Sequence, residues 1–499
     1  MATGGSVQPG IGLGSIARVT FTDLLANGQA VGRIDGRIVV FVTGALPGER
    51  AQVRITQAKA KYLVGEIVTL ESQSPLRVVP FCGVFGVCGG CQVQHLSYPA
   101  QLSWKEQLVR SALRRIGGLG DVDVRHPVGM INPRQYRNKM SLVAQPGPGG
   151  TRLGFYQARS HALVPIAQCP VVLPHLDRAI GILHEAAADG AETAPAFAGV
   201  RHVTMRMGAS SGQAVLSLTT DRPSQAIGEH APALARRLPG VVGVSNSFEP
   251  RNANSVLGRK ISYVYGSREM EEAIEGVKFR VSPASFFQVN SEMVGQIFRY
   301  MAPGIAPGRK IVDLYCGAGT FAIFFATRGA AVIGIEENPA AVREARANTD
   351  LNGVADRATC IEGRGEGSVI NAAGKQALAE AEIVFLDPPR KGSDEATLAA
   401  IARARVHNVW YLSCNPATLA RDLAYLVKAG YQVDVAQPFD MFPQTGHVET
   451  LVTLHFTGSA QVELPPAEGT PWTEQIPDWP SDDRFAHDLY PTFVEPREA

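Results

Sequence analysis

The cysteine at position 414 stands where the reactive group of an enzyme is expected. It lies in YLSCNPATLARDL, between VWYLS, which predicts a β-strand, and a helical pattern that starts at Ala417. Ligands and reactive groups gather at the carboxyl ends of strands in open α/β sheets, and a thiolate there can attack an electrophilic carbon. The alternative is a small residue of the core, because free cysteine is among the most buried residue types.

Two carboxylates follow strands in the same half of the chain. Asp387 in FLDPPRKG ends an apolar strand, and the two prolines after it fix the chain. An acid followed by two prolines is typical of methyltransferases that act on nitrogen or carbon of bases, although it also suits a rigid surface turn. Glu449 lies in FPQTGHVETLVTL, before a terminal strand. A thiol and a carboxylate suit covalent activation of a pyrimidine, because thiolate addition at C6 makes C5 nucleophilic and a base must then remove the C5 proton.

A glycine-rich turn precedes these residues and predicts a nucleotide-like ligand. VDLYCGAGTFAIFFA predicts a strand, a turn with Gly317 and Gly319, and a helix, and the next strand ends in Glu336. Glycines let the backbone approach a ligand, and the acid can bond ribose hydroxyls. The segment alone fits a dinucleotide, with its pyrophosphate at the helix N-terminus, and equally S-adenosylmethionine, with its amino-acid end near Asp313. The LDPPR motif favours S-adenosylmethionine.

The elements that must position these residues change character along the chain. From about residue 286, the short apolar strands KIVDLY, AVIGIE, EIVFLD and VWYLS alternate with helical patterns, which predicts a doubly wound, mostly parallel α/β sheet. Residues 125–285 are mostly strand-like. Residues 15–72 predict a small all-β barrel, and Arg54, Lys59 and Lys61 along one edge suit either an oligonucleotide or a structural cap with solvated side chains.

The seven cysteines indicate metal binding or catalysis. An odd number in a cytosolic chain argues against a disulfide framework. Cys82, Cys88 and Cys91 form a cluster that lacks the second CxxC of a zinc ribbon, and Cys169, in AQCPVV, is the only other cysteine outside the C-terminal half. An iron-sulfur cluster and zinc both stay open at this point, and each needs the fourth ligand.

Charge is distributed unevenly along the 499 residues. The net charge is +1, but residues 458–499 carry nine Asp or Glu against two Arg, so that residues 1–457 carry +8. A basic body suits a polyanionic partner. The N-terminus lacks the basic flank and apolar core of a signal peptide, and no run of about 18 apolar residues occurs. We therefore expect a cytoplasmic protein without a membrane partner.

Four motifs together resemble one known family. DLYCGAGTF, LDPPRKG, SCNPATLARDL and GHVETLV, in this order, resemble the RNA 5-methyluridine (uracil-5-)-methyltransferases of ribosomal and transfer RNA. The barrel resembles the TRAM module often attached to them, and CGVFGVCGGCQVQH resembles the iron-sulfur segment of the ribosomal-RNA branch. The resemblance implies an OB-like TRAM domain at 10–75, a β-rich central domain at 76–285 and a Rossmann-like class I methyltransferase domain at 286–457. Residues 458–499 are acidic and Pro-rich with little periodicity, which predicts a disordered tail.

The resemblance also implies a role for individual residues. Cys414 becomes the nucleophile and Glu449 the proton-abstracting base, while Phe286 stacks on the flipped uracil. The positions that match S-adenosylmethionine contacts are Gln288, Tyr315, Gly317, Thr320, Glu336 and Asp387. The positions that match RNA contacts are Arg137 and Lys139. The resemblance also implies a [4Fe-4S] cluster, held by Cys82, Cys88, Cys91 and Cys169. Two positions depart from the family: Thr320 replaces a common Asn, and Gly363 replaces a polar residue that would hold the adenine.

The sequence therefore predicts a monomeric enzyme that methylates C5 of a uridine in RNA with S-adenosylmethionine. The barrel and cysteine segment favour 23S ribosomal RNA, with transfer RNA as the alternative. A non-catalytic RNA-binding or chaperone protein of the same fold is disfavoured by the intact Cys414 and Glu449. A redox enzyme that uses a dinucleotide is disfavoured by the LDPPR motif.

Overall fold

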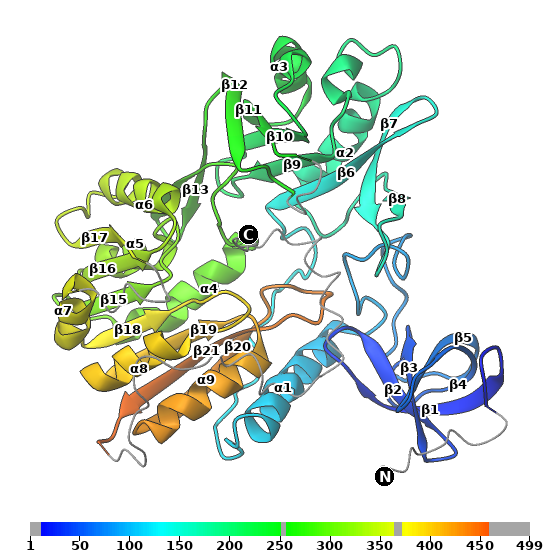
Figure 1. Ribbon diagram of the computed structural model, residues 1–499, viewed down its shortest axis with the longest axis horizontal. Helices are drawn as coiled ribbons and strands as arrows, with labels where there is room; N and C mark the ends of the chain where they lie inside the picture. The colour runs from blue at the N-terminus through cyan, green and yellow to red at the C-terminus, as the bar shows by residue number, and fades with distance from the viewer. Residues whose placement is uncertain (1–10, 251–255, 364–371, 459–499) are drawn as a thin grey trace.

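The chain folds into three β-sheets, and a β-hairpin lies between the second and the third in sequence. The computed structural model describes residues 11–250, 256–363 and 372–458. Figure 1 shows the N-terminal barrel in blue, the central sheet in cyan and green, and the C-terminal sheet with its helices in yellow and orange. The tail predicted at 458–499 lies outside the described residues, apart from Gly458.

No helix in these described ranges has both the length and the apolar character needed to cross a membrane.

The N-terminal barrel is closed. Its strands are β1 (Ile16–Leu24), β2 (Gln29–Ile34), β3 (Ile38–Thr43), β4 (Arg50–Ala58) and β5 (Leu63–Ser72), in the order β1-β2-β3-β5-β4, with β4 also paired to β1. Alternate side chains such as Val53 and Ile55 point inward and are buried. Of the three basic residues expected along one edge of the barrel, Arg54 lies within β4 and pairs with Glu66 at 3.0 Å. Lys59 and Lys61 lie in the β4–β5 connection.

Helix α1 (Tyr98–Arg115) lies between the barrel and the C-terminal sheet, where it packs against helix α9 (Pro416–Lys428). The indole Nε1 of Trp104 donates to the carbonyl oxygen of Leu24 in the barrel at 2.8 Å. The Lys105 side chain is fully buried, and its Nζ donates to Asp440 Oδ1 at 2.5 Å and to the Phe442 oxygen at 3.0 Å. A buried ion pair of this kind fixes geometry, because removing either partner leaves an uncompensated charge. Helix α1 thus ties the N-terminal part of the chain to the loop 440–448.

The central sheet contains seven strands in the order β12-β11-β10-β9-β6-β7-β8. They are β6 (Lys139–Gly147), β7 (Gly150–Tyr156), β8 (Leu163–Pro165), β9 (His202–Met207), β10 (Ala214–Thr220), β11 (Val241–Phe248) and β12 (Lys260–Gly266). Two helices interrupt the stretch that the sequence analysis treated as mostly strand-like: α2 (Pro174–Ala186) and α3 (Gln225–Arg237). In α2, Leu176, Ala179, Ile180 and Leu183 recur at helical spacing and are buried against the sheet.

The C-terminal sheet has the order β17-β16-β15-β18-β19-β21-β20. Its strands are β15 (Lys310–Leu314), β16 (Ala331–Glu336), β17 (Ala358–Glu362), β18 (Ile383–Leu386), β19 (Asn408–Ser413), β20 (Tyr431–Phe439) and β21 (Glu449–Phe456), and its remaining helices are α4 (Ser291–Met301), α5 (Thr320–Thr327), α6 (Pro339–Leu351), α7 (Ala372–Glu380) and α8 (Glu395–Ala404). The first five strands in this order are parallel, whereas β21 is antiparallel to both neighbours. The doubly wound, mostly parallel sheet is confirmed. The chain order reverses between β15 and β18, where open α/β sheets bind ligands.

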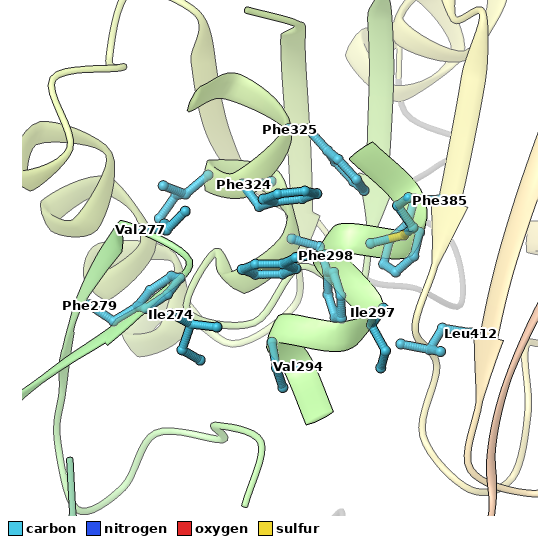
Figure 2. Packing of buried hydrophobic residues seen from close by; sticks show 14 of the residues in the cluster. Ile274, Val277, Phe279, Val294, Ile297, Phe298, Phe324, Phe325, Phe385 and Leu412 are labelled. Carbon is cyan, nitrogen blue, oxygen red and sulfur yellow. The ribbon is translucent and has the colours of Figure 1, made fainter. Parts of the chain in front are cut away.

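An aromatic core fixes the strands that lead to this edge (Figure 2). Phe298 of α4 stacks on Phe324 of α5, with ring centroids 4.0 Å apart and 7° between the planes. The same cluster contains Phe385 of β18 and Leu412 of β19, each two residues before a candidate site residue. The hairpin of β13 (Met270–Ile274) and β14 (Val277–Val281) packs into it as well. This packing leaves the strand ends little freedom to move.

Candidate active site

Strand pairing brings the predicted nucleophile and base together. Strand β21 runs antiparallel to β19, with Thr450 opposite Ser413. Glu449 precedes Thr450 and Cys414 follows Ser413, so these two residues lie at the same end of the strand pair. Strand β18 is the parallel neighbour of β19 on the other side, and Asp387 directly follows its last residue. The thiol and two carboxylates therefore lie at one edge of the sheet, as the sequence motifs predicted.

The residue after Cys414 holds the thiol between strand and helix. Asn415 caps α9, since its Oδ1 accepts a hydrogen bond from the Ala417 backbone N–H at 3.1 Å. Pro416 then begins the helix with a backbone angle already suited to it. Cys414 consequently lies just before a helix N-terminus, where the positive end of the helix dipole stabilises a thiolate once it forms.

Burial and mutual repulsion set the protonation of this group. The pKa of the Cys414 thiol is raised to about 12 by burial and by the negative charges of Glu449 and Asp387, while Arg390 opposes the rise. The pKa of Glu449 is raised well above its usual range by burial and by Asp387. Burial also raises the pKa of Asp387 to about 7, against a hydrogen bond from Gln288 Nε2 to Asp387 Oδ2 at 3.3 Å. The negative charges of these groups therefore disfavour one another, and any positive charge bound beside them favours their ionised forms.

The glycine-rich turn lies next to this group. Tyr315, Gly317 and Gly319 all have positive φ, at 65°, 55° and 87°, which produces a sharp turn between β15 and α5. A Cβ on Gly317 would meet no atom within 4 Å, so the space beside this backbone is open. Thr320 begins α5 and is buried. The Tyr315 hydroxyl is directed to Ser393 Oγ, 3.0 Å away, at the start of α8.

Two acids flank the turn and offer contacts for a nucleoside and an amino group. Glu336 accepts hydrogen bonds from the backbone N–H groups of Gly317 at 3.0 Å and Asn338 at 2.9 Å, which fixes its carboxylate at the end of β16. Asp313 is buried, and among the described residues no side chain hydrogen-bonds its carboxylate, which only the Ala322 backbone N–H approaches. Its pKa is raised well above its usual range by burial and by Asp387. The donor set fits S-adenosylmethionine, because a bound ammonium group would satisfy the buried Asp313 carboxylate.

Phe286 is presented to solvent by a rigid backbone. Its side chain is 57% exposed. The buried Arg206 of β9 donates from Nη2 to the Ser285 oxygen and from Nη1 to the Phe287 oxygen, both at 3.1 Å. Arg206 thus holds the two carbonyl groups that flank Phe286. The sequence analysis missed this residue, because nothing in its strand distinguishes a buried arginine from a solvated one.

The two predicted RNA contacts lie beside the same arginine. Lys139 of β6 stands opposite Arg206 in the β6–β9 pairing. The pKa of Lys139 is well below its usual range because of burial and of the positive charges of Arg206 and Arg137. Arg137 also lowers the pKa of His447, which precedes Glu449 by two residues. A group of neighbouring cations at this place attracts a polyanion.

The four predicted cluster cysteines interact electrostatically. The pKa of Cys91 is raised to about 12 by burial, to which Cys169 and Cys88 add, and that of Cys169 is raised to about 11 by burial, Cys88 and Cys82. All four are free thiols. Across the described ranges, no three His, Cys, Asp or Glu side chains surround one point as ligands of a single metal ion. Gln92, next to Cys91, donates its backbone N–H to the Gln444 oxygen at 3.0 Å, so this segment also contacts the loop before Glu449.

Family models match three parts of the chain. A TRAM domain matches residues 13–68, the RNA cap guanine-N2 methyltransferase model matches residues 308–397, and the tRNA (Uracil-5-)-methyltransferase model matches residues 372–456. The first covers the barrel, the second the glycine-rich turn and Asp387, and the third Cys414 and Glu449.

Whole-chain relatives agree with these matches. An uncharacterized RNA methyltransferase of Halalkalibacterium halodurans is 34% identical over 460 residues, which is 90% of this chain and 98% of the relative. Another, of Thermosynechococcus vestitus, is 37% identical over 451 residues, 88% of this chain and 98% of the relative. The Pyrococcus abyssi tRNA (uracil-54, C5)-methyltransferase in complex with S-adenosyl-L-homocysteine is 26% identical, with a TM-score of 0.67 over 88% of this chain and all of that one.

Fold, site and relatives together define a class I, S-adenosylmethionine-dependent RNA methyltransferase with an N-terminal TRAM domain. Within this class, the chain belongs to the RNA (uracil-5-)-methyltransferase family.

Proposed function

We propose that the enzyme methylates C5 of a uridine in 23S ribosomal RNA through a covalent bond between Cys414 and C6 of the base. The observation that carries this proposal is the register of β21 against β19, which sets Glu449 beside Cys414, with Asp387 at the end of the adjacent strand. Uracil C5 alone is a poor nucleophile, so a methyltransferase for this carbon needs a thiol at C6 and a base at C5. This site offers both.

The proposed reaction assigns one task to each side chain. When bound, S-adenosylmethionine supplies an electrophilic methyl group and a positive charge. The Cys414 thiol loses its proton to a neighbouring carboxylate and its sulfur bonds to C6, which places an electron pair on C5. After C5 has gained the methyl group, Glu449 removes the C5 proton, and the returning electron pair breaks the S–C6 bond. Phe286 stacks on the flipped uracil, and Gln288 holds Asp387 in position.

The raised pKa of Cys414 is consistent with this sequence of events. A buried thiol with a pKa of about 12 stays protonated and unreactive until substrates arrive. The negative charges of Glu449 and Asp387 both raise that pKa; the thiol proton passes to Asp387, so that Glu449 remains ionised and can later remove the C5 proton.

Ribosomal RNA is the proposed substrate because the barrel and the cysteine segment occur together in this chain. Transfer RNA is the second candidate, since the solved Pyrococcus abyssi relative is a transfer-RNA enzyme. Mapping 5-methyluridine by mass spectrometry in ribosomal and transfer RNA from a deletion strain separates the two. We expect one 5-methyluridine to disappear from 23S ribosomal RNA, and a loss confined to transfer RNA would contradict the substrate assignment.

We also propose that the chain acts as a monomer in the cytoplasm, where its RNA is made. The domain boundaries near residues 75 and 285 remain predictions; β5 ends at Ser72, and the β13–β14 hairpin shares its core with α4 and α5.

A [4Fe-4S] cluster is proposed for Cys82, Cys88, Cys91 and Cys169. Burial raises the pKa values of Cys88, Cys91 and Cys169, and the neighbouring thiols of this set add to the rise, which supports the proposal. In such a cluster each thiolate bonds to a different iron, so the sulfurs stand farther apart than the ligands of one ion. The cluster would hold two segments together, residues 82–91 and the loop that contains Cys169, and the transfer of a methyl group requires no electrons from it.

Iron analysis provides a test of the cluster. Protein purified without oxygen should contain about four irons per chain, and Cys169→Ser should lower the iron content while the alkylation rate of Cys414 stays unchanged. Stoichiometric zinc without iron would contradict the assignment. Cys360→Ser, at a cysteine of β17, is the matched control and should retain the full iron content.

Arg137→Gln should weaken RNA binding with little effect on S-adenosylmethionine affinity. If Arg137 contacts a phosphate, the slope of log K against log salt concentration should fall by about one. Filter binding at several salt concentrations measures this slope. Arg236→Gln, on the exposed side of α3, is the matched control. An unchanged slope with Arg137→Gln would exclude a phosphate contact at this residue.

A further inference from the structure

The loop that carries Arg390 is tied to the segment after Cys414. The backbone oxygen of Arg390 accepts hydrogen bonds from Asn415 Nδ2 at 3.0 Å and from Thr418 Oγ1 at 3.2 Å. Asn415 is the residue next to the nucleophile, and Arg390 follows Asp387 by three residues. The backbone position of Arg390 is therefore set by the thiol side of the site.

The Arg390 side chain is held from the side of the base. Its Nη2 lies 3.2 Å from His447 Nδ1 and 3.1 Å from His447 Nε2. Both of these nitrogens are bonded to Cε1. If Nη2 lay in the plane of the ring at equal distances from the two nitrogens, it would collide with that carbon. Nη2 must instead lie over the ring face. The guanidinium thus contacts the face of an aromatic ring, an interaction that arginine favours.

The His447 ring is suited to this contact because it stays neutral. Burial and the positive charges of Arg390, Lys105 and Arg137 hold its pKa well below the usual range. Phe442 contacts the ring edge-on, with centroids 5.9 Å apart. A neutral ring attracts the guanidinium, whereas an imidazolium would repel it.

Arg390 acts on both reacting groups. It is the cation that opposes the raised pKa of the Cys414 thiol and that of the Glu449 carboxylate. A guanidinium near both groups stabilises the thiolate as it forms and the carboxylate that later accepts the C5 proton. The distance of the guanidinium from each group decides how much it stabilises each.

We propose that His447 is a positioning residue, whose neutral ring holds the Arg390 guanidinium between the Cys414 thiol and the Glu449 carboxylate. The inference rests on the proposed function, since it assigns His447 a part in the same reaction. His447 acts through Arg390 and itself transfers no proton.

The pH dependence of Cys414 alkylation tests this role without RNA or cofactor. Mass spectrometry of the peptide that contains Cys414 gives its rate of reaction with iodoacetamide at each pH. His447→Ala should move the profile to higher pH, and a shift of one pKa unit means about tenfold slower alkylation at a fixed pH. His447→Phe keeps a neutral ring face and should restore most of the rate. His455→Ala, at a half-buried histidine of β21 that contacts Asp434 at 2.6 Å, is the matched control.

A double variant keeps the test independent of folding effects. If His447 acts through Arg390, His447→Ala should change the alkylation profile little when Arg390→Gln is already present. A wild-type profile for His447→Ala, or equal additional shifts in both backgrounds, would overturn the inference. The proposed function fails separately, if the wild-type enzyme makes no 5-methyluridine.

Discussion

Cys414→Ala is expected to abolish methyl transfer, with a loss in kcat on the order of 10⁴-fold or more, as for the removal of other covalent nucleophiles. The affinity for S-adenosylmethionine should change by no more than about twofold, because the thiol supplies the covalent step and not the binding energy. Incorporation of labelled methyl groups into RNA measures the first quantity, and calorimetric titration of the cofactor measures the second.

Cys414→Ser separates chemistry from packing in this experiment. Serine nearly preserves the volume of the side chain, yet its hydroxyl ionises far less readily than a thiol, so this variant should be as inactive as Cys414→Ala. Methylation at a rate near that of the wild type in either variant would rule out the covalent mechanism. Activity in the serine variant alone would mean that the pocket needs only a polar group at this position.

Glu449→Gln should stop the reaction one step later. The carboxylate acts after the methyl group has moved, when the C5 proton must leave before Cys414 can be released. Methylated RNA should therefore remain bonded to the protein. Denaturing electrophoresis with methyl-labelled cofactor should show a slowly migrating, labelled adduct that is absent from the double variant with Cys414→Ala.

The alternative role of Glu449 is structural. Its carboxylate is buried at the first position of β21, and Oε1 has no hydrogen-bond partner in the described part of the chain. Glutamine at this position would then alter stability, while methylated RNA would be released over many turnovers. That outcome would remove Glu449 from the proposed mechanism.

The sequence predicted the reacting groups because their positions are determined locally. Cys414 and Asp387 each end an apolar strand and precede prolines, so that strand, turn and helix follow from residues close in sequence. The parallel sheet places such strand ends together. The pairing of β21 with β19 is a long-range contact that was not predicted, and the role of Glu449 as the base came from the family resemblance.

The residues that position the site were less visible in the sequence. Arg206 contacts a loop about 80 residues away, and Lys105 pairs with Asp440 across more than 300 residues. An arginine or lysine in a strand or helix usually lies in solvent, and only the tertiary structure shows that these two are buried. The sequence contains only a weak indication that Arg390 belongs to the site, namely that it directly follows the two prolines of the Asp387 motif. The N-terminal barrel was predicted from the sequence, but the positions of its basic side chains on the barrel could not be assigned without the strand order.

Tritium release from RNA that contains [5-³H]uridine tests the central claim most directly. Methylation at C5 replaces the hydrogen on that carbon, so the wild-type enzyme with S-adenosylmethionine should release tritium into water in proportion to the methyl groups incorporated. Cys414→Ala and a reaction without cofactor should release none. Methyl incorporation without tritium release would show that the methyl group goes to another atom, and it would contradict the account.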